Sequence, residues 1–264
     1  MVALIQRLAV EKLDALVITS LVHVRYLTGF TGSNGALLLR PGRSLLFTDP
    51  RYTEQAAAES SVAVRIVKRG PLLSAVNAEL AKRKPRRVAF EKNRISYADY
   101  ARLNDGKPMR TELVGADGWV ERERAIKTAD ELAKIRASVL LNSAALEAAR
   151  RHFRAGITEK EFAAEIDYQQ RRRGAEKPSF DTIVASGAHA ARPHASPRAE
   201  KIASDQLLLI DMGAFLDGYA SDMTRTFAVG QTSRRDRGVY AAVLEAQQAA
   251  IEAVRAGVPV SKVD

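Results

Sequence analysis

Two aspartates stand in the segment Leu207–Gly230, LLLIDMGAFLDGYASDMTRTFAVG, where their type and spacing could do chemistry together. Asp211 ends one of the most apolar runs in the chain, so we expect its carboxylate to enter the interior, and Asp222 follows eleven residues later. The stretches that flank the turn-prone middle read as two strands, which predicts a hairpin.

The hairpin loop decides where the two carboxylates lie. A two-residue loop at Leu216-Asp217 places them directly opposite each other, whereas a two-residue loop at Asp217-Gly218 makes them diagonal neighbours. Both loops put them on one face of the sheet, because side chains alternate along a strand. A three-residue loop would separate them onto opposite faces.

Two ionised carboxylates held this close repel each other and are costly to desolvate, so they need a cation, a shared proton or an arginine. A pair of metal ions suits two acids carried on strands. Thr224 and Thr226 could then supply hydroxyls that orient the ligating carboxylates. In the alternative interpretation Asp222 pairs with Arg225 while Asp211 caps a turn, and the geometry alone leaves both open.

Four histidines could join such a site. His189 and His194 share the loop GAHAARPHASP, which two prolines keep extended, and loops on a rigid scaffold often carry catalytic groups. For either one alone, a solvated loop residue is the plainer interpretation. His23 lies in the alternating segment LVHVRYL and reads as a packed or surface side chain, and His152, in the last turn of a helix, reads as structural.

Composition limits the chemistry further. The chain has no cysteine, which excludes disulfides, thiolate metal sites and cysteine nucleophiles, so any metal must be held by carboxylates, imidazoles, carbonyls or water. The net charge is +10, but the basic clusters contain no interleaved aromatic residues and aromatics make up only 6% of the chain. We therefore expect no nucleic-acid partner.

The sequence shows no sign of membrane attachment or secretion. Its N-terminus lacks the order of charged and apolar residues that marks a signal peptide. No apolar run approaches the roughly 18 residues needed to span a bilayer. We expect a cytoplasmic protein with no membrane partner.

The chain divides into an α/β region, residues 1–122, and a second region, residues 123–264, in which helices precede the strands that carry the aspartates. In the second region a helix is expected at Asp130–Arg154, and Thr158–Glu161 fits a capping box that opens the next helix. The elements expected in the first region are strands at Ala15–Thr19, Ala36–Leu39, Ser44–Thr48, Val62–Val67 and Arg87–Phe90, and helices at Ile5–Leu13, Tyr52–Ser60 and Leu72–Lys82.

The second region contains a partial repeat. The helix expected at Arg237–Arg255 ends in Arg-Ala-Gly, as the segment that ends at Gly156 does, and Ser261–Asp264 again fits a capping box. If the unit is duplicated, the second copy stops before its second helix, its loop and its strands. We therefore expect the chain to be incomplete at its C-terminus.

Together these motifs resemble the pita-bread metallopeptidases, and more closely their proline-specific branch, the Xaa-Pro dipeptidases (prolidases) and aminopeptidase P. The likeness rests on PSFDTIVASG, on the His194 loop and on DMGAFLDGYASDMTRTF around the two aspartates. The pieces YLTGFTGSNG and LFTDPRYTEQ are similar to the N-terminal domain of that branch. The resemblance implies an α/β creatinase-like domain (residues 1–122) and the first part of an α+β pita-bread catalytic domain (residues 123–264).

The resemblance also implies an activity, which is metal-dependent hydrolysis of the bond before proline in di- or oligopeptides. Asp211 would bind one divalent ion and Asp222 would bridge two, usually manganese, cobalt or zinc. His194 would contact the substrate and help the proton transfer or stabilise the tetrahedral intermediate. The family also suggests a homodimer.

The sequence departs from the family at its end, because a further metal-ligating histidine and two glutamates, one of them the general base, would follow the last residue. With only two ligand residues we expect weak binding of divalent ions and no cleavage by the 264-residue chain alone. The alternative is a non-catalytic protein that keeps the fold and binds protein or nucleic acid through its basic surface. Such a protein need not retain Asp211, Asp222 and His194, which favours the peptidase.

Overall fold

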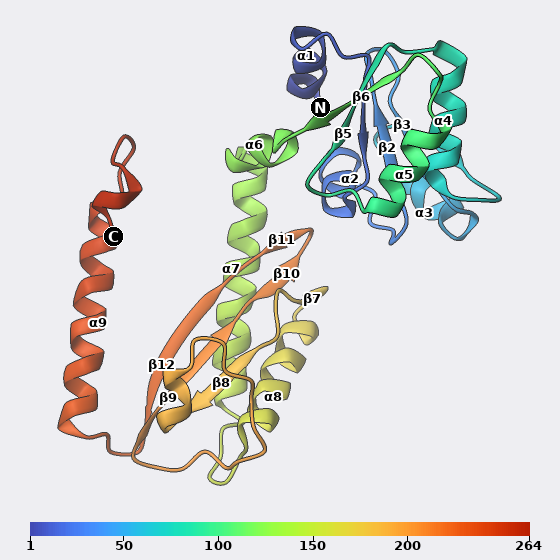
Figure 1. The fold of residues 1–264 in the computed structure, drawn as a ribbon. Coiled ribbons are helices and arrows are strands. Elements are labelled where there is room, and N and C mark those ends of the chain that lie inside the picture. Colours follow the sequence, from blue (N-terminus) through green and yellow to red (C-terminus); the bar gives the residue numbers. More distant parts are fainter. The chain divides into compact units, whose positions relative to one another are not determined.

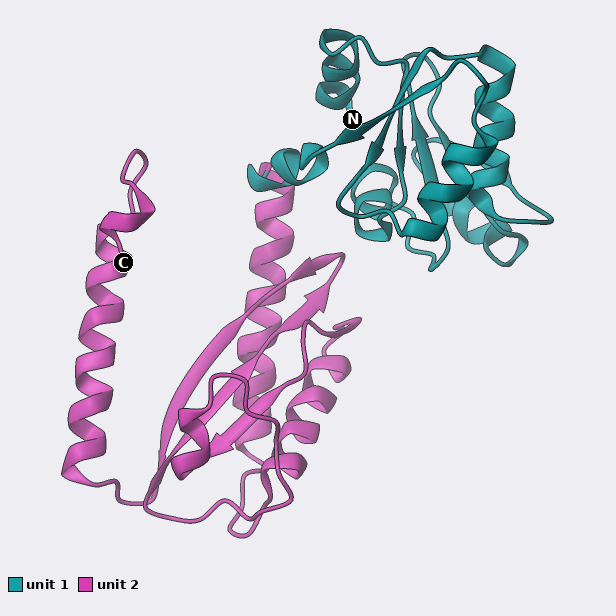
Figure 2. Ribbon diagram, viewed as in Figure 1, with its two compact units in different colours: residues 1–127 teal, residues 128–264 magenta.

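The computed structural model describes residues 1–264, which form two compact units, residues 1–127 and 128–264 (Figure 2). The division falls between Lys127 and Thr128, the N-cap residue of a long helix. No helix in either unit is long and apolar enough to cross a membrane.

Unit 1 is built on a six-stranded sheet with the order β4-β3-β2-β1-β5-β6 (Figure 1). β2 is antiparallel to both of its neighbours, and the other pairs are parallel. The strands are β1 (Ala15–Ile18), β2 (Ala36–Leu39), β3 (Leu45–Thr48), β4 (Ala63–Ile66), β5 (Arg87–Glu91) and β6 (Glu112–Ala116). The helices are α1 (Val2–Val10), α2 (Leu21–Thr28), α3 (Thr53–Glu59), α4 (Leu72–Arg83), α5 (Tyr97–Gly106) and α6 (Trp119–Ala125), with a 3-10 turn η1 (Pro50–Tyr52).

The central strands of unit 1 are buried on both faces. In β1, Leu16 and Ile18 belong to one core, and Ala15 and Val17 belong to another. Such strands read as unbroken apolar runs, which explains why the central strands β1, β2 and β3 were predicted. The strands predicted at β4 and β5 are confirmed as well. β6, α2, α5 and α6 were not predicted.

The alternating segment around His23 forms helix α2. The helix ends at Gly29, whose φ of 85° is a left-handed conformation that glycine adopts without a Cβ penalty. His23 is packed, as one of the two interpretations expected, with 1% of its surface exposed. Its Nδ1 contacts the carboxylate of Glu91, and its Nε2 lies 3.8 Å from Oε1 of Glu121.

Unit 2 begins with α7 (Ala129–Arg150) and α8 (Glu159–Arg172). The predicted capping box of α8 is confirmed, because the side chains of Thr158 and Glu161 each bond to the backbone N–H of the other. α7 ends at Arg150, four residues before the predicted Arg154, and Phe153 beyond it packs edge-on against Phe162, with ring centroids 5.1 Å apart. His152 therefore lies beyond the helix and is exposed, and its placement in the last turn was wrong.

The strands of unit 2 form two antiparallel sheets, in the orders β8-β9-β12 and β7-β10-β11. They are β7 (Lys177–Pro178), β8 (Ile183–Ser186), β9 (Gln206–Met212), β10 (Ala214–Leu216), β11 (Tyr219–Ala220) and β12 (Met223–Val229). One face of the sheet that contains β9 packs against α7 and α8 (Figure 1). There Leu208, Ile210 and Met212 of β9 share a core with Phe162 and Ile166.

The remainder of unit 2 is the helix α9 (Arg234–Ala253) and two 3-10 turns, η2 (Gly187–Ala191) and η3 (Val260–Lys262). α9 overlaps the predicted helix Arg237–Arg255 and has no buried residue. The segment Ser261–Asp264, where a helix start was expected, overlaps the 3-10 turn η3 and does not test that expectation.

Candidate functional site

The structure selects one of the two loops that the sequence left open. Phe215 pairs with Ala220 and Leu216 with Tyr219, which leaves Asp217-Gly218 as a two-residue loop. Both loop residues have positive φ, 49° and 84°, the combination of a type I′ turn, which matches the twist of a hairpin.

The same register continues through β9 and β12, so that Thr224 lies directly opposite Asp211. Asp222, two residues before Thr224, is therefore the diagonal neighbour of Asp211 on the same face of the sheet. Thr224 Oγ1 donates a hydrogen bond of 2.8 Å to Asp211 Oδ1, so one predicted hydroxyl does orient a carboxylate of the pair.

The expectation that the carboxylates enter the interior was wrong. β9 turns Leu208, Ile210 and Met212 into the core, and Asp211, which alternates with them, points to the other face and is half-buried. Asp222 is exposed. The buried residues of the apolar run therefore lie on the face of the sheet that α7 and α8 cover. The two aspartates lie on the opposite, open face.

No basic side chain neutralises the pair. Arg225 donates its guanidinium hydrogen bond, 2.8 Å long, to the carbonyl of Thr224, so the alternative pairing of Asp222 with Arg225 is not formed. Asp211 accepts only the Thr224 hydroxyl, and Asp222 accepts no side-chain hydrogen bond. Most acceptor positions of both carboxylates are free for a ligand.

The donor chemistry of the pair fits a hard or borderline divalent ion, since both side chains offer carboxylate oxygens on one open face. The number of donors is small, however. No group of three or more histidine, cysteine, aspartate or glutamate side chains in the chain could hold a metal ion. The residues present thus fit part of a metal site, with two ligand residues.

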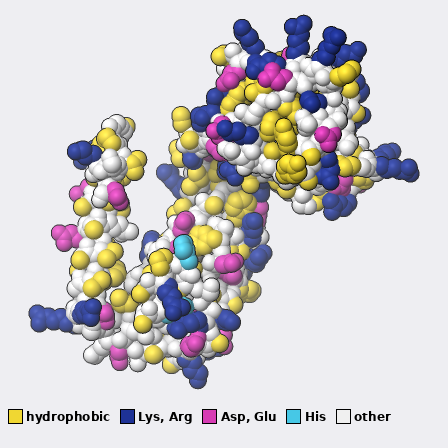
Figure 3. Space-filling model, in the orientation of Figure 1, with side chains coloured by type: hydrophobic (Ala, Val, Ile, Leu, Met, Phe, Trp, Pro, Cys, Tyr) yellow, Lys and Arg dark blue, Asp and Glu magenta, His cyan; other side chains and the backbone are white.

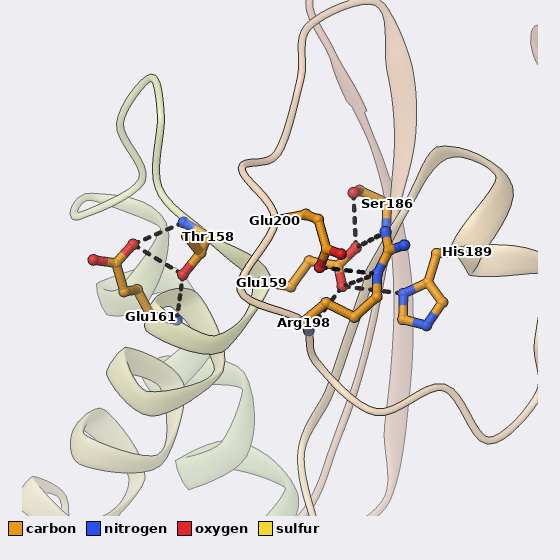
Figure 4. Close-up of polar contacts among 7 residues, drawn as sticks. All are labelled: Thr158, Glu159, Glu161, Ser186, His189, Arg198 and Glu200. Atoms are coloured by element: carbon orange, nitrogen blue, oxygen red, sulfur yellow. Dashed lines mark hydrogen bonds and ion pairs between the residues drawn. The ribbon is translucent and has the colours of Figure 1, made fainter.

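The other histidine candidate, His189, occupies a different environment (Figure 4). It is buried in η2, and its Nδ1 lies 3.0 Å from Oε2 of Glu159, the first residue of α8. An ionised carboxylate only accepts hydrogen bonds, so Nδ1 carries the proton. His189 is therefore held inside the protein and is not free to reach a substrate.

Glu159 gathers donors from both ends of the loop that carries the histidines (Figure 4). It is fully buried and accepts hydrogen bonds of 2.8 Å from N and Oγ of Ser186, and of 3.0, 3.1 and 3.2 Å from N, Nε and Nη2 of Arg198. Burial alone would raise the pKa of Glu159, but the bonds from Arg198 and Ser186 outweigh it and lower the pKa from 4.5 to about 2.

His194 lies between these two anchors. His189 ties the loop to Glu159 on one side of it, and Arg198 does so on the other. The side chain of His194 is exposed and makes no hydrogen bond, with Asp211 or Asp222 or with any other residue. The structure thus brings Asp211, Asp222 and Thr224 together, fixes the loop that carries His194, and leaves the imidazole of His194 free.

Sequence reasoning missed Glu159 and Arg198. Glu159 stands in the capping-box stretch TEKE, where an acid in the first turn of a helix reads as an exposed side chain that favours the helix dipole. Nothing local distinguishes it from Glu161, because its partner Arg198 lies 39 residues away. The basic residues elsewhere are spread over much of the face in Figure 3 and do not form one band.

Comparisons with known proteins agree with this architecture. Residues 133–264 match the model of metallopeptidase family M24, and residues 2–126 match the creatinase/prolidase N-terminal domain. The chain is 33% identical to the uncharacterized peptidase YqhT of Bacillus subtilis over 96% of its own length and 71% of that protein. It is 37% identical to an Xaa-Pro dipeptidase of Lactobacillus helveticus over 67% of its length and 48% of that protein.

A solved structure is also similar. The X-Pro aminopeptidase of Thermotoga maritima superposes with a TM-score of 0.90 at 33% identity, covering 96% of this chain and 73% of that one. These matches confirm the fold class expected from the sequence, a creatinase-like N-terminal domain followed by a pita-bread domain.

Proposed function

Because the chain belongs to metallopeptidase family M24, whose members use divalent metal ions, we propose that its residues serve the hydrolysis of peptide bonds that precede proline, as in an Xaa-Pro dipeptidase or aminopeptidase P. The single observation that carries the proposal is the pair Asp211 and Asp222, which share one open sheet face with no basic residue to neutralise them. The Xaa-Pro dipeptidase and the X-Pro aminopeptidase to which the chain is similar support the choice of substrate.

Each residue of the pair has a stated role in this proposal. Asp211 and Asp222 would hold the divalent ions, with manganese as the first choice and cobalt or zinc as substitutes. Thr224 keeps Asp211 in a fixed orientation through its hydroxyl, as its 2.8 Å hydrogen bond supports. Divalent ions bound by carboxylates supply Lewis-acid catalysis and an activated nucleophile for the hydrolysis of amides.

His194 is the residue of the chain that we assign to the substrate. Its exposed imidazole can donate a hydrogen bond to the carbonyl of the scissile bond, and so stabilise the charge that develops on that oxygen. The Glu159 cluster holds the backbone on both sides of His194, which limits how far the imidazole can move. His189 serves this cluster and not the substrate.

Residues 1–264 contain only two of the proposed metal ligands. Two carboxylates bind divalent ions weakly, because affinity follows ligand count and charge. We expect residues 1–264 alone to bind Mn²⁺ weakly and to turn over no peptide. A cytoplasmic homodimer is the form that we propose for the active protein.

The test is peptide hydrolysis by the product of the intact gene, purified with Mn²⁺. Ala-Pro and Ala-Pro-Ala are assayed beside Ala-Ala, and the gene product with Asp222→Asn is the matched variant. Cleavage of the proline peptides that Asp222→Asn abolishes, with an unchanged circular dichroism spectrum, is the expected result. Equal rates for wild type and Asp222→Asn, or no preference for proline, would overturn the proposal.

A further inference from the structure

The hairpin that carries the two aspartates is interrupted beside Asp222. β9 and β10 are separated by Gly213, and β11 and β12 are separated by Ser221 and Asp222. Pairing is in the same register on both sides of this break, so no residue has been inserted. The interruption is instead a local replacement of backbone hydrogen bonds by side-chain hydrogen bonds.

Ser221 makes this replacement. Its N–H donates to the carbonyl of Ala214 at 2.8 Å, as an antiparallel pair requires. The N–H of Ala214 does not return the bond to the Ser221 carbonyl but donates to Ser221 Oγ at 3.0 Å. The freed carbonyl of Ser221 accepts from Ser179 Oγ at 2.9 Å. The residue directly before Asp222 is therefore fixed by its own side chain.

The helices behind the sheet supply the other partners. Ser138 of α7 is fully buried, and its Oγ lies 2.8 Å from the carbonyl of Ala214 and 3.0 Å from Ser221 Oγ. Asn142, one turn further along α7, donates to the carbonyl of Met212 at 3.1 Å. Gln170 of α8 donates to the carbonyl of Gly213, also at 3.1 Å.

Gly213 makes the close approach possible. A Cβ built at this position would lie 2.2 Å from the carbonyl oxygen of Ser221, which no side chain could tolerate without a shift of the backbone. The backbones of the two hairpin strands therefore lie closer together at Gly213 than they could if this residue had a side chain. The buried hydroxyls then hold them there.

We infer that Ser221 and Ser138 are positioning residues for Asp222, which set its carboxylate relative to Asp211 and so determine how well the pair binds a divalent cation. The inference rests on the proposed function, since it takes the pair to be a cation site. Asp222 itself is exposed and has no side-chain partner, so only its backbone can be held. Ser221, 4% exposed and adjacent in the chain, is the residue that holds it.

The test is a titration of the full 264-residue chain with Mn²⁺, with free Mn²⁺ followed by its electron paramagnetic resonance signal. Ser221→Ala and Ser138→Ala each remove one buried hydroxyl and are expected to weaken Mn²⁺ binding by about tenfold or more, the usual cost of losing a group that orients a metal ligand. Ser233→Ala is the control, because it removes a hydroxyl of unit 2 that accepts a hydrogen bond from the N–H of Asp236 at the start of α9. It should leave the affinity unchanged.

A second control separates positioning from general loss of stability. Ile166→Val removes one methyl group from the core of unit 2 and should lower the melting temperature without changing Mn²⁺ affinity. Serine variants that bind Mn²⁺ as tightly as wild type, or an equal loss in Ile166→Val, would overturn the inference. If Ser221→Ala does not fold, Ser138→Ala gives the same test from the helix side.

Asp222→Asn shows whether a negative result overturns the positioning inference alone or the proposed metal site as well. If this variant loses Mn²⁺ binding while Ser221→Ala and Ser138→Ala keep it, the positioning inference is wrong and the metal assignment stands. If Asp222→Asn binds Mn²⁺ as wild type does, the pair is not the cation site, and both the inference and the proposed function are overturned.

Discussion

Unit 2 contains two carboxylate sites with opposite designs. Glu159 is fully buried and surrounded by donors from Ser186, His189 and Arg198. Asp211 and Asp222 lie on an open face, where Asp211 accepts one side-chain hydrogen bond, from Thr224, and Asp222 accepts none. A carboxylate can accept about four hydrogen bonds, so Glu159 is saturated and the aspartates are not.

The contrast separates a structural acid from an acid available to a ligand. The saturated carboxylate of Glu159 closes the loop that carries His194 and has no position left for a cation. The aspartates are neighbouring carboxylates without a basic partner, an arrangement that adds little to folding and is suited to binding a positive ion. Free acceptor capacity, more than burial, distinguishes the two aspartates that we propose to bind a cation from Glu159.

Among variants that test the contrast between Glu159 and the aspartates, Glu159→Gln should have the largest effect on the free energy of unfolding. The variant removes the negative charge that Arg198 and His189 face in a buried site, and should cost about 3 kcal/mol in the free energy of unfolding. Glu161→Gln, in the exposed capping box of the same helix, should cost much less, because glutamine can also close a capping box. Urea denaturation measures both, and equal losses would show that Glu159 is no more structural than its neighbour.

The pH dependence of stability should show the same site. The pKa of Glu159 falls from 4.5 when unfolded to about 2 when folded, so folding favours the ionised form. Its contribution is therefore fully present above pH 4.5 and is lost as the pH falls toward 2. The difference in unfolding free energy between wild type and Glu159→Gln should shrink by about 2 kcal/mol across that range. A gap that stays constant with pH would contradict the assignment.

Gly213→Ala probes the close approach of strands beside the open pair. Its Cβ would meet the carbonyl of Ser221 at 2.2 Å, and the strain should cost about 2 kcal/mol. Gly238→Ala is the matched control in α9, where a Cβ would meet nothing within 4 Å and helix propensity should improve by up to about 1 kcal/mol. Thermal unfolding compares the two, and a neutral Gly213→Ala would mean that the break can relax.

The smallest effect is expected at the aspartates themselves. Without metal, Asp211→Asn and Asp222→Asn should each change the free energy of unfolding by no more than about 0.5 kcal/mol, in the stabilising direction, because each removes repulsion between two like charges. Chemical denaturation in the presence of a chelator measures this. A large loss of stability in either variant would mean that these carboxylates are structural, as Glu159 is.

Much of the fold could be predicted because its signals are local. The apolar strands of unit 1 and the capping box of α8 follow from residue type and spacing. The hairpin register was reduced to two choices, and the positive φ of Asp217 and Gly218 decided between them. An Asp-Gly pair favours that turn, but the sequence alone does not exclude the neighbouring loop.

The rest depends on partners that are distant in the sequence. The side chains of β9 that enter the core are those on the face that α7 and α8 cover. The apolar run before Asp211 does not show which face is covered, so the sequence alone does not place Asp211 in the core or on the open side. Glu159 cannot be told from Glu161 without Arg198, 39 residues later. The serines and amides that hold the break beside Asp222 read as ordinary helix and strand residues until their buried acceptors are known.

The most direct test of the central claim is the melting temperature of the 264-residue chain at increasing Mn²⁺ concentration, compared with that of the double variant Asp211→Asn/Asp222→Asn. An ion that binds only the folded chain raises the melting temperature with its concentration. We predict a rise for wild type and for Ser233→Ala, and none for the double variant. A double variant that is stabilised as much as wild type would contradict the claim that the open aspartate pair is the cation site.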